Sequence, residues 1–194
     1  MVNLSGGSPA DAQPTAKWVL ELGANFGDAA IMNNVDHMGQ PGPRSVLAGD
    51  AAHQARIAPV MACLAQGIRY VSPNIHAAKA TYQAFEMTYF GHFAAARHAA
   101  DICLPEGIAL THLQALHGND PVHQGYVQSL IDGHLSTDTS TLETSAADLA
   151  MIRNQAAVAG IASPFPDLLA GFFDRAIAAG HGQDDAMAIW KALT

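Results

Sequence analysis

The stretch HAAKATYQAFEMTYFGHFAAARHAADICL, residues 76–104, decides the fold of this chain. It holds no proline and only one glycine, Gly91, so nothing in it interrupts a helix. Apolar residues recur along it at alternating steps of four and three, and the opposite face is rich in Ala, Met and Phe, so the helix is apolar on all sides. At about 1.5 Å per residue it would be ~43 Å long, which exceeds what a domain of this size should contain. The pattern therefore predicts a helix that passes into the partner subunit of a homodimer.

The residues before this helix, 1–74, predict a small α/β unit. Short apolar runs bounded by Gly, Pro and Asn alternate there with helical patterns, which is typical of a mostly parallel sheet. The expected strands are 2–5, 26–32, 44–48 and 68–71, and the expected helices are 10–22 and 51–66. Four strands and two helices make only part of a Rossmann-like domain, so we predict a truncated α/β remnant.

The residues from 75 onward predict an all-α domain. After the long helix, further helical patterns cover roughly 110–116, 122–131, 142–159, 166–179 and 184–193. Pro166 and Gly180 fall where helices prefer a proline at the start and a glycine just past the end. We therefore expect residues 75–194 to form a helical domain for dimerisation and substrate binding.

The composition excludes two classes of partner. The chain has 194 residues, a net charge of −8 with His neutral, and nine Lys and Arg that form no basic stripe, so nucleic-acid binding is not expected. No apolar run approaches about eighteen residues and no secretion signal opens the chain, so we expect a cytoplasmic protein without a membrane span. Only 13% of the residues are charged, which favours a large buried interface between subunits. Cys63 and Cys103 lie in apolar helical patterns and are expected to be buried free thiols.

The sequence offers no cradle for a dinucleotide. No G-x-G-x-x-G turn follows a strand and precedes a helix, which is where a pyrophosphate would bind. The nearest match, GHGQDD at residues 180–185, lies between two helical patterns and carries two carboxylates, so we interpret it as a joint between helices. We therefore expect no cofactor, with NADPH entering only if a separate subunit supplies the nucleotide-binding part. The spacing of the histidines matches no compact zinc pattern, so no metal is expected either.

Five stretches resemble one known family. VNLSGGSP (2–9), DAAIM (28–32) and SVLAGD (45–50) are similar to successive segments of imine reductases and reductive aminases. Residues 76–91 resemble the start of their long inter-domain helix, and FDRAIAAGHG (173–182) is close to their C-terminal signature. The matches fall in order and span essentially the whole chain. The resemblance places the chain in the β-hydroxyacid dehydrogenase superfamily, starting near the fourth strand of the Rossmann sheet.

The resemblance implies a fold and a site. The family has a Rossmann domain, a long helix, and a helical domain that intertwines with its partner in a dimer. Its active site lies between the Rossmann domain of one subunit and the helical domain of the other. On this resemblance, a small-molecule substrate would bind in a cleft at the dimer interface.

Tyr82 is the strongest catalytic candidate, because the resemblance places it where the family has a proton donor. A phenol with an ordinary pKa of about 10 is protonated at neutral pH and can donate to a developing amine or alkoxide. The alternative is a core aromatic at helical spacing. Lys79 lies three residues before the position of the catalytic lysine of the dehydrogenases, so we expect a lysine that is solvated or that snorkels to bring its charged end into water. Ser5 matches a family position near the nicotinamide, and its alternative is a turn residue.

Polar residues of the helical domain supply further candidates. His117 and Asp120 are the other predicted catalytic residues, since His and Asp form acid–base pairs and the resemblance places residues 117–126 near the substrate cleft. His92 and His98 are expected to be partnered histidines of the core or of an interface. The residues predicted to line the substrate site are Met32, Asn33, Asn34, Tyr89, His123 and Tyr126. Asparagines are also common in turns for backbone reasons, so that alternative stays open for the adjacent pair.

These expectations lead to three hypotheses for the function. The first, which we favour, is a cofactor-independent enzyme that uses acid–base catalysis to cyclise, isomerise or dehydrate a small natural-product intermediate. The second is an NADPH-dependent imine or ketone reductase that needs a separate Rossmann subunit. The third is a non-catalytic protein that binds a small molecule or acts as a scaffold.

Overall fold

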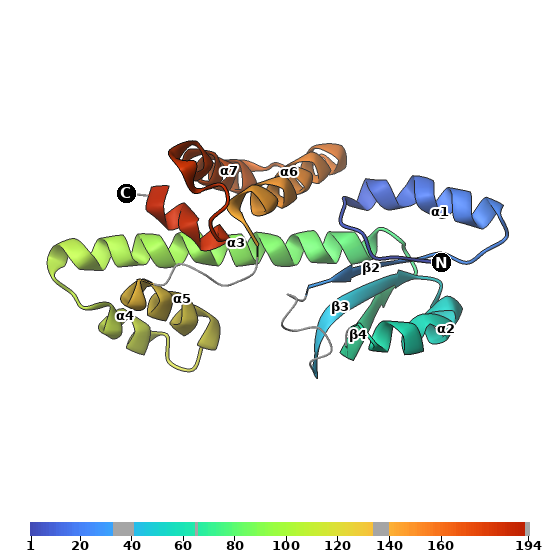
Figure 1. Ribbon diagram of the computed structural model, residues 1–194, viewed down its shortest axis with the longest axis horizontal. Helices are drawn as coiled ribbons and strands as arrows, with labels where there is room; N and C mark the ends of the chain where they lie inside the picture. The colour runs from blue at the N-terminus through green and yellow to red at the C-terminus, as the bar shows by residue number, and fades with distance from the viewer. Residues whose placement is uncertain (33–40, 65, 134–139, 193–194) are drawn as a thin grey trace. The chain divides into compact units, whose positions relative to one another are not determined.

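The computed structural model describes residues 1–32, 41–64, 66–133 and 140–192 (Figure 1). The chain forms two compact units, Met1–Phe85 and Glu86–Thr194. We expected the division at residues 74 and 75, before the long helix. The first turns of that helix instead belong to the first unit, because they pack on its sheet.

The predicted long helix is confirmed as one uninterrupted element, α3, Ala77–Cys103. No proline removes a hydrogen bond from its ladder, and its apolar residues are held by protein on more than one side. None of the helices in the described ranges combines the length and the apolar character that a membrane span requires.

A four-stranded sheet in the order β1-β2-β3-β4 organises the first unit. Its strands are β1 Val2–Asn3, β2 Gly27–Ile31, β3 Pro41–Gly49 and β4 Gln66–Ser72. β1 pairs with β2 in parallel and β3 pairs with β4 in parallel, which agrees with the predicted Rossmann-like remnant. β2 and β3 pair antiparallel. The connection between them, residues 32–40, is shorter than the roughly dozen residues that a parallel crossover needs.

Helices pack on both faces of this sheet. The face that carries Ala29 and Leu47 packs against Met61 of α2, Ala51–Ala62. The opposite face carries Ala30 and packs against Ala78, in the first turn of α3. The remaining helix, α1 Ala12–Glu21, follows a 3-10 turn at Pro9–Asp11. Alternation along β2 thus buries both of its faces, as expected for a strand inside an α/β unit.

Two residues set the joint between β3 and α2. Gly49 has a φ of +121°, and a Cβ there would lie 2.9 Å from the carbonyl oxygen of Phe26, so glycine is required. Asp50 then caps α2 by accepting a hydrogen bond from the backbone N–H of Ala52 at 2.9 Å.

Cys63, at the other end of α2, is exposed. The expectation that it is buried is wrong, because it lies beyond the side of the helix that faces the sheet.

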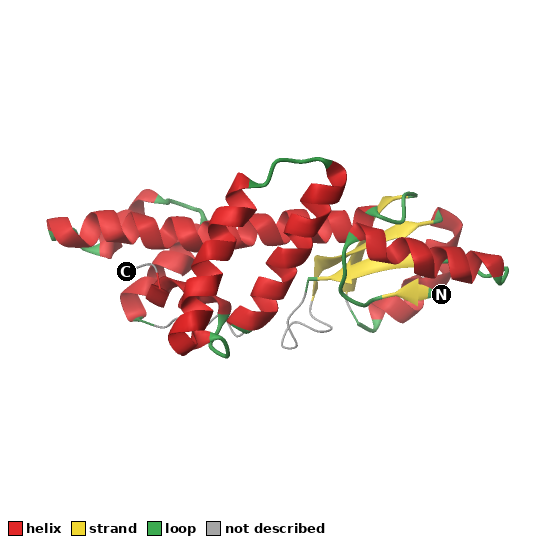
Figure 2. Cartoon of the chain, turned by 90° about the horizontal axis from the view of Figure 1, so that it is seen from above, coloured by secondary structure: helices red, strands yellow, loops and turns green. Residues whose placement is uncertain are grey.

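The second unit is helical throughout its described ranges (Figures 1 and 2). Its helices besides α3 are α4 Leu110–Leu116, α5 Pro121–Asp132, α6 Leu142–Ala159 and α7 Pro164–Ala176, followed by a π-helical turn at Ile177–His181 and a 3-10 helix at Ala186–Ala192. In Figure 1, α6 and α7 lie on one side of α3, and α4 and α5 lie on the other. The all-α domain is therefore confirmed, and both its last helix and the short turn Leu104–Glu106 after α3 take the tighter 3-10 form.

Aromatic side chains form the core of the second unit. Phe90 and Phe93 of α3 pack with Phe173 of α7 and with Trp190 of the final 3-10 helix. The Trp190 indole N–H donates a hydrogen bond to the carbonyl oxygen of Phe93 at 2.6 Å, so its burial leaves its one polar atom paired. The GHGQDD stretch connects the π-helical turn to this 3-10 helix through Gly180, whose φ is +94°, which confirms the predicted joint.

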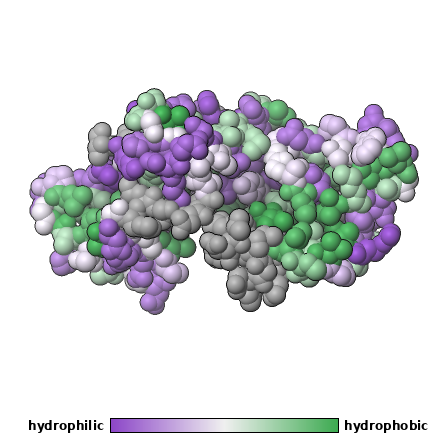
Figure 3. Space-filling view, viewed as in Figure 1, coloured by the Kyte–Doolittle hydropathy of each residue, from purple (hydrophilic) through white to green (hydrophobic). Residues whose placement is uncertain are grey.

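Large apolar side chains remain on the surface of the second unit. Ile102 and Leu104 are exposed at the end of α3, where apolar surface gathers at the left of Figure 3, and Leu116 of α4 is 85% exposed. Exposed apolar side chains at one end of a unit are typical of a surface that meets a partner. The homodimer stays a prediction that this surface favours.

Candidate functional site

The predicted site residues fall in both compact units. Tyr82 and Met32 belong to the first unit. The second unit holds Tyr89, His117, Asp120, His123 and Tyr126. Asn33 and Asn34 lie outside the described residues.

Tyr82 is a residue of α3, and its side chain lies against the face of the sheet that α3 covers. It is half-buried and packs, together with Met32, against the cluster of Ala30, Val46 and Ala78. This position agrees with the alternative that Tyr82 is an aromatic residue of the core, and it leaves part of the side chain accessible. The role of Tyr82 as a proton donor stays a prediction.

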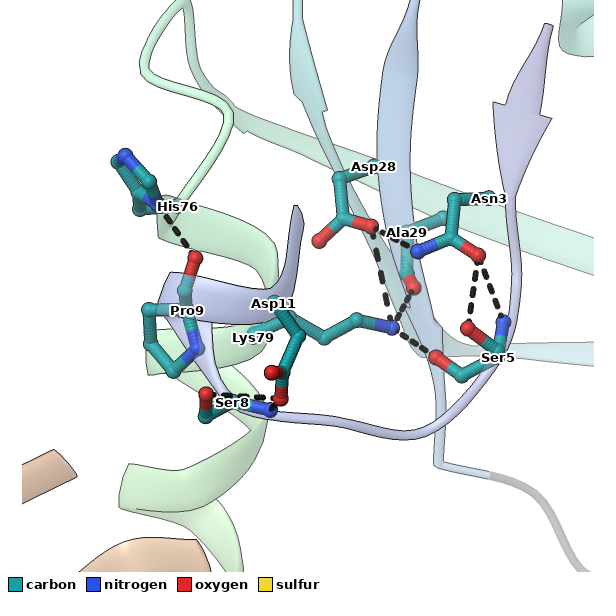
Figure 4. A network of polar contacts seen from close by, with 9 residues as sticks. All are labelled: Asn3, Ser5, Ser8, Pro9, Asp11, Asp28, Ala29, His76 and Lys79. Carbon is teal, nitrogen blue, oxygen red and sulfur yellow. Dashed lines mark hydrogen bonds and ion pairs between the residues drawn. The ribbon is translucent and has the colours of Figure 1, made fainter. Parts of the chain in front are cut away.

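Lys79, one turn before Tyr82, is the residue whose environment differs most from expectation (Figure 4). Its side chain is only 3% exposed, so the expectation of a solvated lysine is wrong. The Nζ atom donates hydrogen bonds to the carbonyl oxygens of Ser5 and Ala29, the latter at 2.8 Å, and lies 3.9 Å from Oδ1 of Asp28. The lysine is buried because the first turns of α3 pack on the sheet, where its Nζ meets Ser5, Ala29 and Asp28.

Asp28 completes a buried pair of opposite charges. Its Oδ1 accepts a hydrogen bond from the Asn3 side-chain amide at 2.9 Å, and its Oδ2 has no hydrogen-bond partner among the described residues. Burial raises the pKa of Asp28, and the Lys79 charge, the Asn3 amide and His76 oppose that rise. Burial likewise lowers the pKa of Lys79, against the effect of Asp28.

Ser5 belongs to the same network. Its hydroxyl donates to Oδ1 of Asn3 at 2.8 Å, and its backbone N–H points to the same oxygen at 3.2 Å. Figure 4 shows Asn3 bridging Ser5 to Asp28, with Lys79 closing the network from α3. The network links the loop after β1, the strand β2 and the helix α3. The contacts of Ser5 with Asn3 agree with its alternative role as a turn residue, and its carbonyl oxygen also accepts a hydrogen bond from Lys79. Sequence reasoning missed it, although a charged residue at the start of the apolar strand 28–32 was a signal that a partner was needed.

Three histidines of the second unit form a row of rings that we call the histidine row: His92, His117 and His123. The rings of His117 and His123 are stacked, with centroids 5.0 Å apart and planes inclined by 12°. The rings of His92 and His123 are 4.7 Å apart. The row joins α3, the end of α4 and the first turn of α5, so residues far apart in sequence meet there.

Asp120 orients the central ring of the row. As the N-cap of α5, it accepts hydrogen bonds through Oδ1 from the backbone N–H groups of Val122 and His123, at 3.0 and 3.2 Å. Its Oδ2 lies 2.6 Å from Nδ1 of the His123 ring. These hydrogen bonds lower the pKa of Asp120, and the bond with the His123 side chain has the largest effect. Asp120 is therefore a carboxylate at neutral pH. A carboxylate on Nδ1 leaves Nε2 to exchange protons, which is how histidines act in acid–base catalysis.

Tyr89 and Tyr126 line the aromatic side of the row. Tyr126 is buried and contacts the rings of His92 and Phe93, at centroid distances of 6.3 and 5.1 Å. Burial, and to a lesser degree Tyr89, raises the pKa of Tyr126, so its phenol stays protonated. Tyr89 packs on Phe93 with centroids 4.4 Å apart. Of the predicted residues, the structure thus brings His117, Asp120 and His123 together, with the two tyrosines beside them.

A groove with a volume of about 980 Å³ lies between α3 and α7. Residues of α3, both small and polar, line one side, and apolar residues of α7 form a wall, among them Phe165, Leu168 and Phe172. Gly91 permits the close contact of the two helices, because a Cβ there would lie 2.9 Å from the ring of Phe165. His92 lines the groove and also contacts His123, so the histidine row reaches the groove. Sequence reasoning did not predict the groove, since it expected His92 only as a partnered histidine of the core or of an interface.

No group of three or more His, Cys, Asp or Glu side chains that could hold a metal ion occurs in the part of the chain that the structure describes. Within the histidine row, the rings of His117 and His123 are stacked, whereas those of His92 and His123 are inclined by 59°.

Comparison with known proteins matches the two-unit architecture. The family described as NADPH-dependent reductive aminase-like, C-terminal domain, matches residues 74–194. No curated protein matches the chain. Among solved structures, an imine reductase variant from Myxococcus stipitatus in complex with NAD+ is 26% identical, with a TM-score of 0.58, over 100% of this chain and 70% of that one.

Two other solved structures extend the likeness. A reductive aminase from Aspergillus terreus in complex with NADPH and ethyl levulinate is 25% identical, with a TM-score of 0.50, over 100% of this chain and 69% of that one. A 3-hydroxyisobutyrate dehydrogenase from Salmonella typhimurium shares the fold, at 24% identity and a TM-score of 0.81, over 98% of this chain and 68% of that one. The predicted resemblance to imine reductases and reductive aminases is confirmed. The chain belongs to the reductive aminase-like family, whose C-terminal domain its residues 74–194 form.

Proposed function

We propose that this protein is an acid–base enzyme that binds a small apolar carbonyl or imine compound and moves protons on it, as cyclisation, isomerisation or dehydration requires. In this proposal the proton transfers need no cofactor of the chain's own. The observation that carries the proposal is the imidazole of His123, held by Asp120 at 2.6 Å and in ring contact with His92, a residue of the groove.

The groove supports binding of such a compound. Ligand pockets in proteins typically have volumes of ~300–1,000 Å³ and combine apolar walls with a few polar groups that orient the ligand. The groove between α3 and α7, at about 980 Å³, has that character: Phe165 and Phe172 supply apolar surface and His92 a polar group. An imine or a ketone has a similar division, with an apolar body and one polar atom.

The histidine row supports proton transfer. In the proposed step, Nε2 of His123 or the neighbouring His92 takes a proton from the carbon next to the carbonyl or iminium group. The electron pair of the broken C–H bond forms a C=C bond, and the π electrons of the C=O or C=N bond move to oxygen or nitrogen. That oxygen or nitrogen atom takes a proton from a side chain at the edge of the groove or from water. Return of a proton to a different atom completes an isomerisation. Asp120 stabilises the imidazolium that forms in between.

The test uses a probe rather than the unidentified substrate. 4-Phenylbutan-2-one has protons next to its ketone at C3, and their exchange in D2O is followed by proton NMR. We expect the purified chain to accelerate C3 exchange over buffer, and His123→Gln to lose about a hundredfold of that acceleration. Asp120→Asn keeps a capping oxygen on α5 but removes the charge, so it should lower exchange while the fold is retained. His112→Gln, on the exposed side of α4, is the matched control and should exchange like the wild type.

Exchange at the buffer rate, or equal exchange in the wild type and His123→Gln, contradicts the proposal. Binding of the probe without any exchange supports instead the non-catalytic hypothesis of a small-molecule carrier.

A second candidate function is supported by the family itself. Its description names NADPH-dependent reductive aminases, and the imine reductase and reductive aminase structures contain nicotinamide nucleotides. In this candidate, a separate subunit would hold the nucleotide, the nucleotide would supply hydride chemistry, and the histidine row would donate the proton to the imine nitrogen. Adding NADPH and the cyclic imine 2-methyl-1-pyrroline to the chain together with a separate nucleotide-binding subunit separates the candidates, because loss of NADPH fluorescence in step with amine formation occurs only in the second.

A further inference from the structure

The groove carries an arginine whose placement says more about the ligand, and the inference rests on the proposed function. Arg175 lines the groove from the last turn of α7. Its guanidinium carbon lies 5.0 Å from the centroid of the Phe172 ring, one turn earlier on the same helix. Stacking on an aromatic face holds a guanidinium flat and leaves its N–H donors directed outward from the edge of the plane.

The other charges at the groove do not neutralise this arginine. Asp101 also lines the groove, but its Oδ1 is bound by Nε of Arg97 at 2.8 Å. Asp167, earlier on α7, is bound by Arg153 at 2.6 Å. Within the described ranges, Arg175 makes no ion pair with a carboxylate, although the chain carries a net charge of −8.

The remaining titratable groups of the groove are His92 and His98, which are either neutral or positive. The groove therefore has an uncompensated positive charge in an otherwise acidic chain. The C-terminal end of a helix tolerates such a cation, because the helix carbonyls there carry partial negative charge. Arg175 is also exposed, so water solvates its guanidinium in the absence of a carboxylate, and the fork of N–H donors remains available to a ligand.

The order of residues along α7 defines the shape of the ligand. Phe165, Leu168 and Phe172 form the apolar wall, and Arg175 follows at the next helical step on the same side. An apolar body against the wall would thus place a terminal group at the guanidinium. A planar carboxylate fits two parallel N–H donors of an arginine, which gives both affinity and orientation.

We infer that the groove binds an apolar carboxylic acid, with its hydrocarbon part on the α7 wall and its carboxylate on Arg175. Combined with the proposed acid–base step, the substrate class is an apolar keto acid or imino acid.

Two probes test this inference and differ only in the relevant group. 2-Oxo-4-phenylbutanoate and 4-phenylbutan-2-one share the phenyl ring, the two-carbon spacer and the ketone, and the first has a carboxylate where the second has a methyl group. We expect calorimetry to give about tenfold tighter binding for the keto acid. Arg175→Gln should remove about that factor for the keto acid and leave the affinity for the ketone unchanged. Arg153→Gln, which removes an arginine of the exposed pair with Asp167, should leave both affinities unchanged.

Further measurements keep the test decisive. The preference for the keto acid should weaken as sodium chloride is added, because a rim charge is screened by salt. Arg175→Lys retains the charge without the fork and should recover only part of the preference, which separates recognition from loss of packing on Phe172. Near-ultraviolet circular dichroism of Arg175→Gln checks that the groove still folds.

The outcomes distinguish this inference from the proposed function. Equal affinity for the two probes, or an equal loss of both in Arg175→Gln, overturns the carboxylate inference even if C3 exchange is accelerated. Selective binding of the keto acid through Arg175 supports the inference even where neither probe exchanges faster than in buffer, in which case the proposed function fails alone. Failure of both probes to bind a folded protein overturns the groove as a ligand site and points to a second copy of the chain as its occupant.

Discussion

Lys79 and Asp28 form a charged pair in a place where neither residue could remain alone. A buried ion pair is expensive to desolvate, and it persists only where further hydrogen bonds satisfy its atoms. Here the carbonyl oxygens of Ser5 and Ala29 take two of the lysine donors, and the Asn3 amide holds one carboxylate oxygen. The other carboxylate oxygen is without a partner among the described residues, so the pair depends strongly on the lysine.

Lys79→Met should therefore destabilise the first unit by about 3 kcal/mol or more, because it leaves a buried carboxylate without its counter-charge. Urea denaturation measures the free energy of unfolding. Lys17→Met is the matched control: its ion pair with Glu21 is exposed, at 3.9 Å, and should contribute ~0.5 kcal/mol or less. The double variant Lys79→Met with Asp28→Asn should recover part of the loss. If Lys79→Met is no more destabilising than Lys17→Met, the pair of Lys79 and Asp28 does not contribute to the free energy of unfolding.

The burial of Lys79 could not be predicted from local sequence. A lysine beside alanines on a helix is equally consistent with a solvated side chain and with a stem that covers apolar surface. Which of these holds depends on Asp28 and Ser5, residues that are far away in sequence and meet Lys79 only in the folded unit. The link between His123 and Asp120, by contrast, lies within one capping turn, and both were candidates from the sequence.

At the scale of elements, α3 and α6 bring two carboxyl groups into one partly buried environment. Burial raises the pKa of Glu86 on α3 to about 7, and the negative charge of Asp148 on α6 raises it as well. Burial also raises the pKa of Asp148. Both helices pack in the core of the second unit, so their carboxyl groups are protonated more readily when the protein is folded than when it is unfolded.

The stability of the second unit should therefore fall as pH rises. The unfolded chain releases the Glu86 proton near pH 4.5, whereas the folded chain retains it to about pH 7. Between these values the unfolded state binds fewer protons, so the free energy of unfolding decreases with pH and levels off above the folded pKa. Glu86→Gln should flatten this dependence in denaturant titrations and be more stable than the wild type above pH 7.

Glu106→Gln, at an exposed position after α3, provides the control and should follow the wild-type profile. A Glu86→Gln profile parallel to that of the wild type would show that this carboxyl group is not protonated in the folded state. Asp148 acts in the same direction, so part of the slope should remain in the variant.

The elements themselves were largely predictable, for reasons that differ along the chain. Periodicity and the lack of proline fix α3, because these properties act within one segment. The antiparallel pairing of β2 with β3 was not predicted, because the alternation of strands and helices indicated only a mostly parallel sheet and the short connection between these two strands was not considered. The groove between α3 and α7 was not predictable, since it depends on the contact that Gly91 permits with Phe165.

At the scale of the whole molecule, family membership and surface composition lead to an expectation about assembly. The chain is reductive aminase-like, only 13% of its residues are charged, and apolar side chains are exposed at the end of α3. Exposed apolar side chains of this kind favour association. A homodimer would cover them.

Sedimentation equilibrium should therefore give twice the mass of the chain. Replacing Ile102 and Leu104 together by Glu should shift the protein toward the monomer, because charges in an apolar interface cost several kcal/mol unless paired. Val158→Glu, at a position of α6 that is 75% exposed, is the control and should remain dimeric. A wild-type protein that stays monomeric at high concentration would contradict the expectation.

The chain has two tryptophans, one in each unit, whose intrinsic fluorescence can be used to follow unfolding. Trp18 lies on α1 of the first unit and is 58% exposed, whereas Trp190 is fully buried in the second unit beside Phe93. Indole emission shifts to longer wavelength when water replaces protein around the ring, so unfolding of the second unit should dominate the spectral change. Replacing Trp18 by Phe would leave a single fluorophore, and melting of the helical core could then be followed without a label.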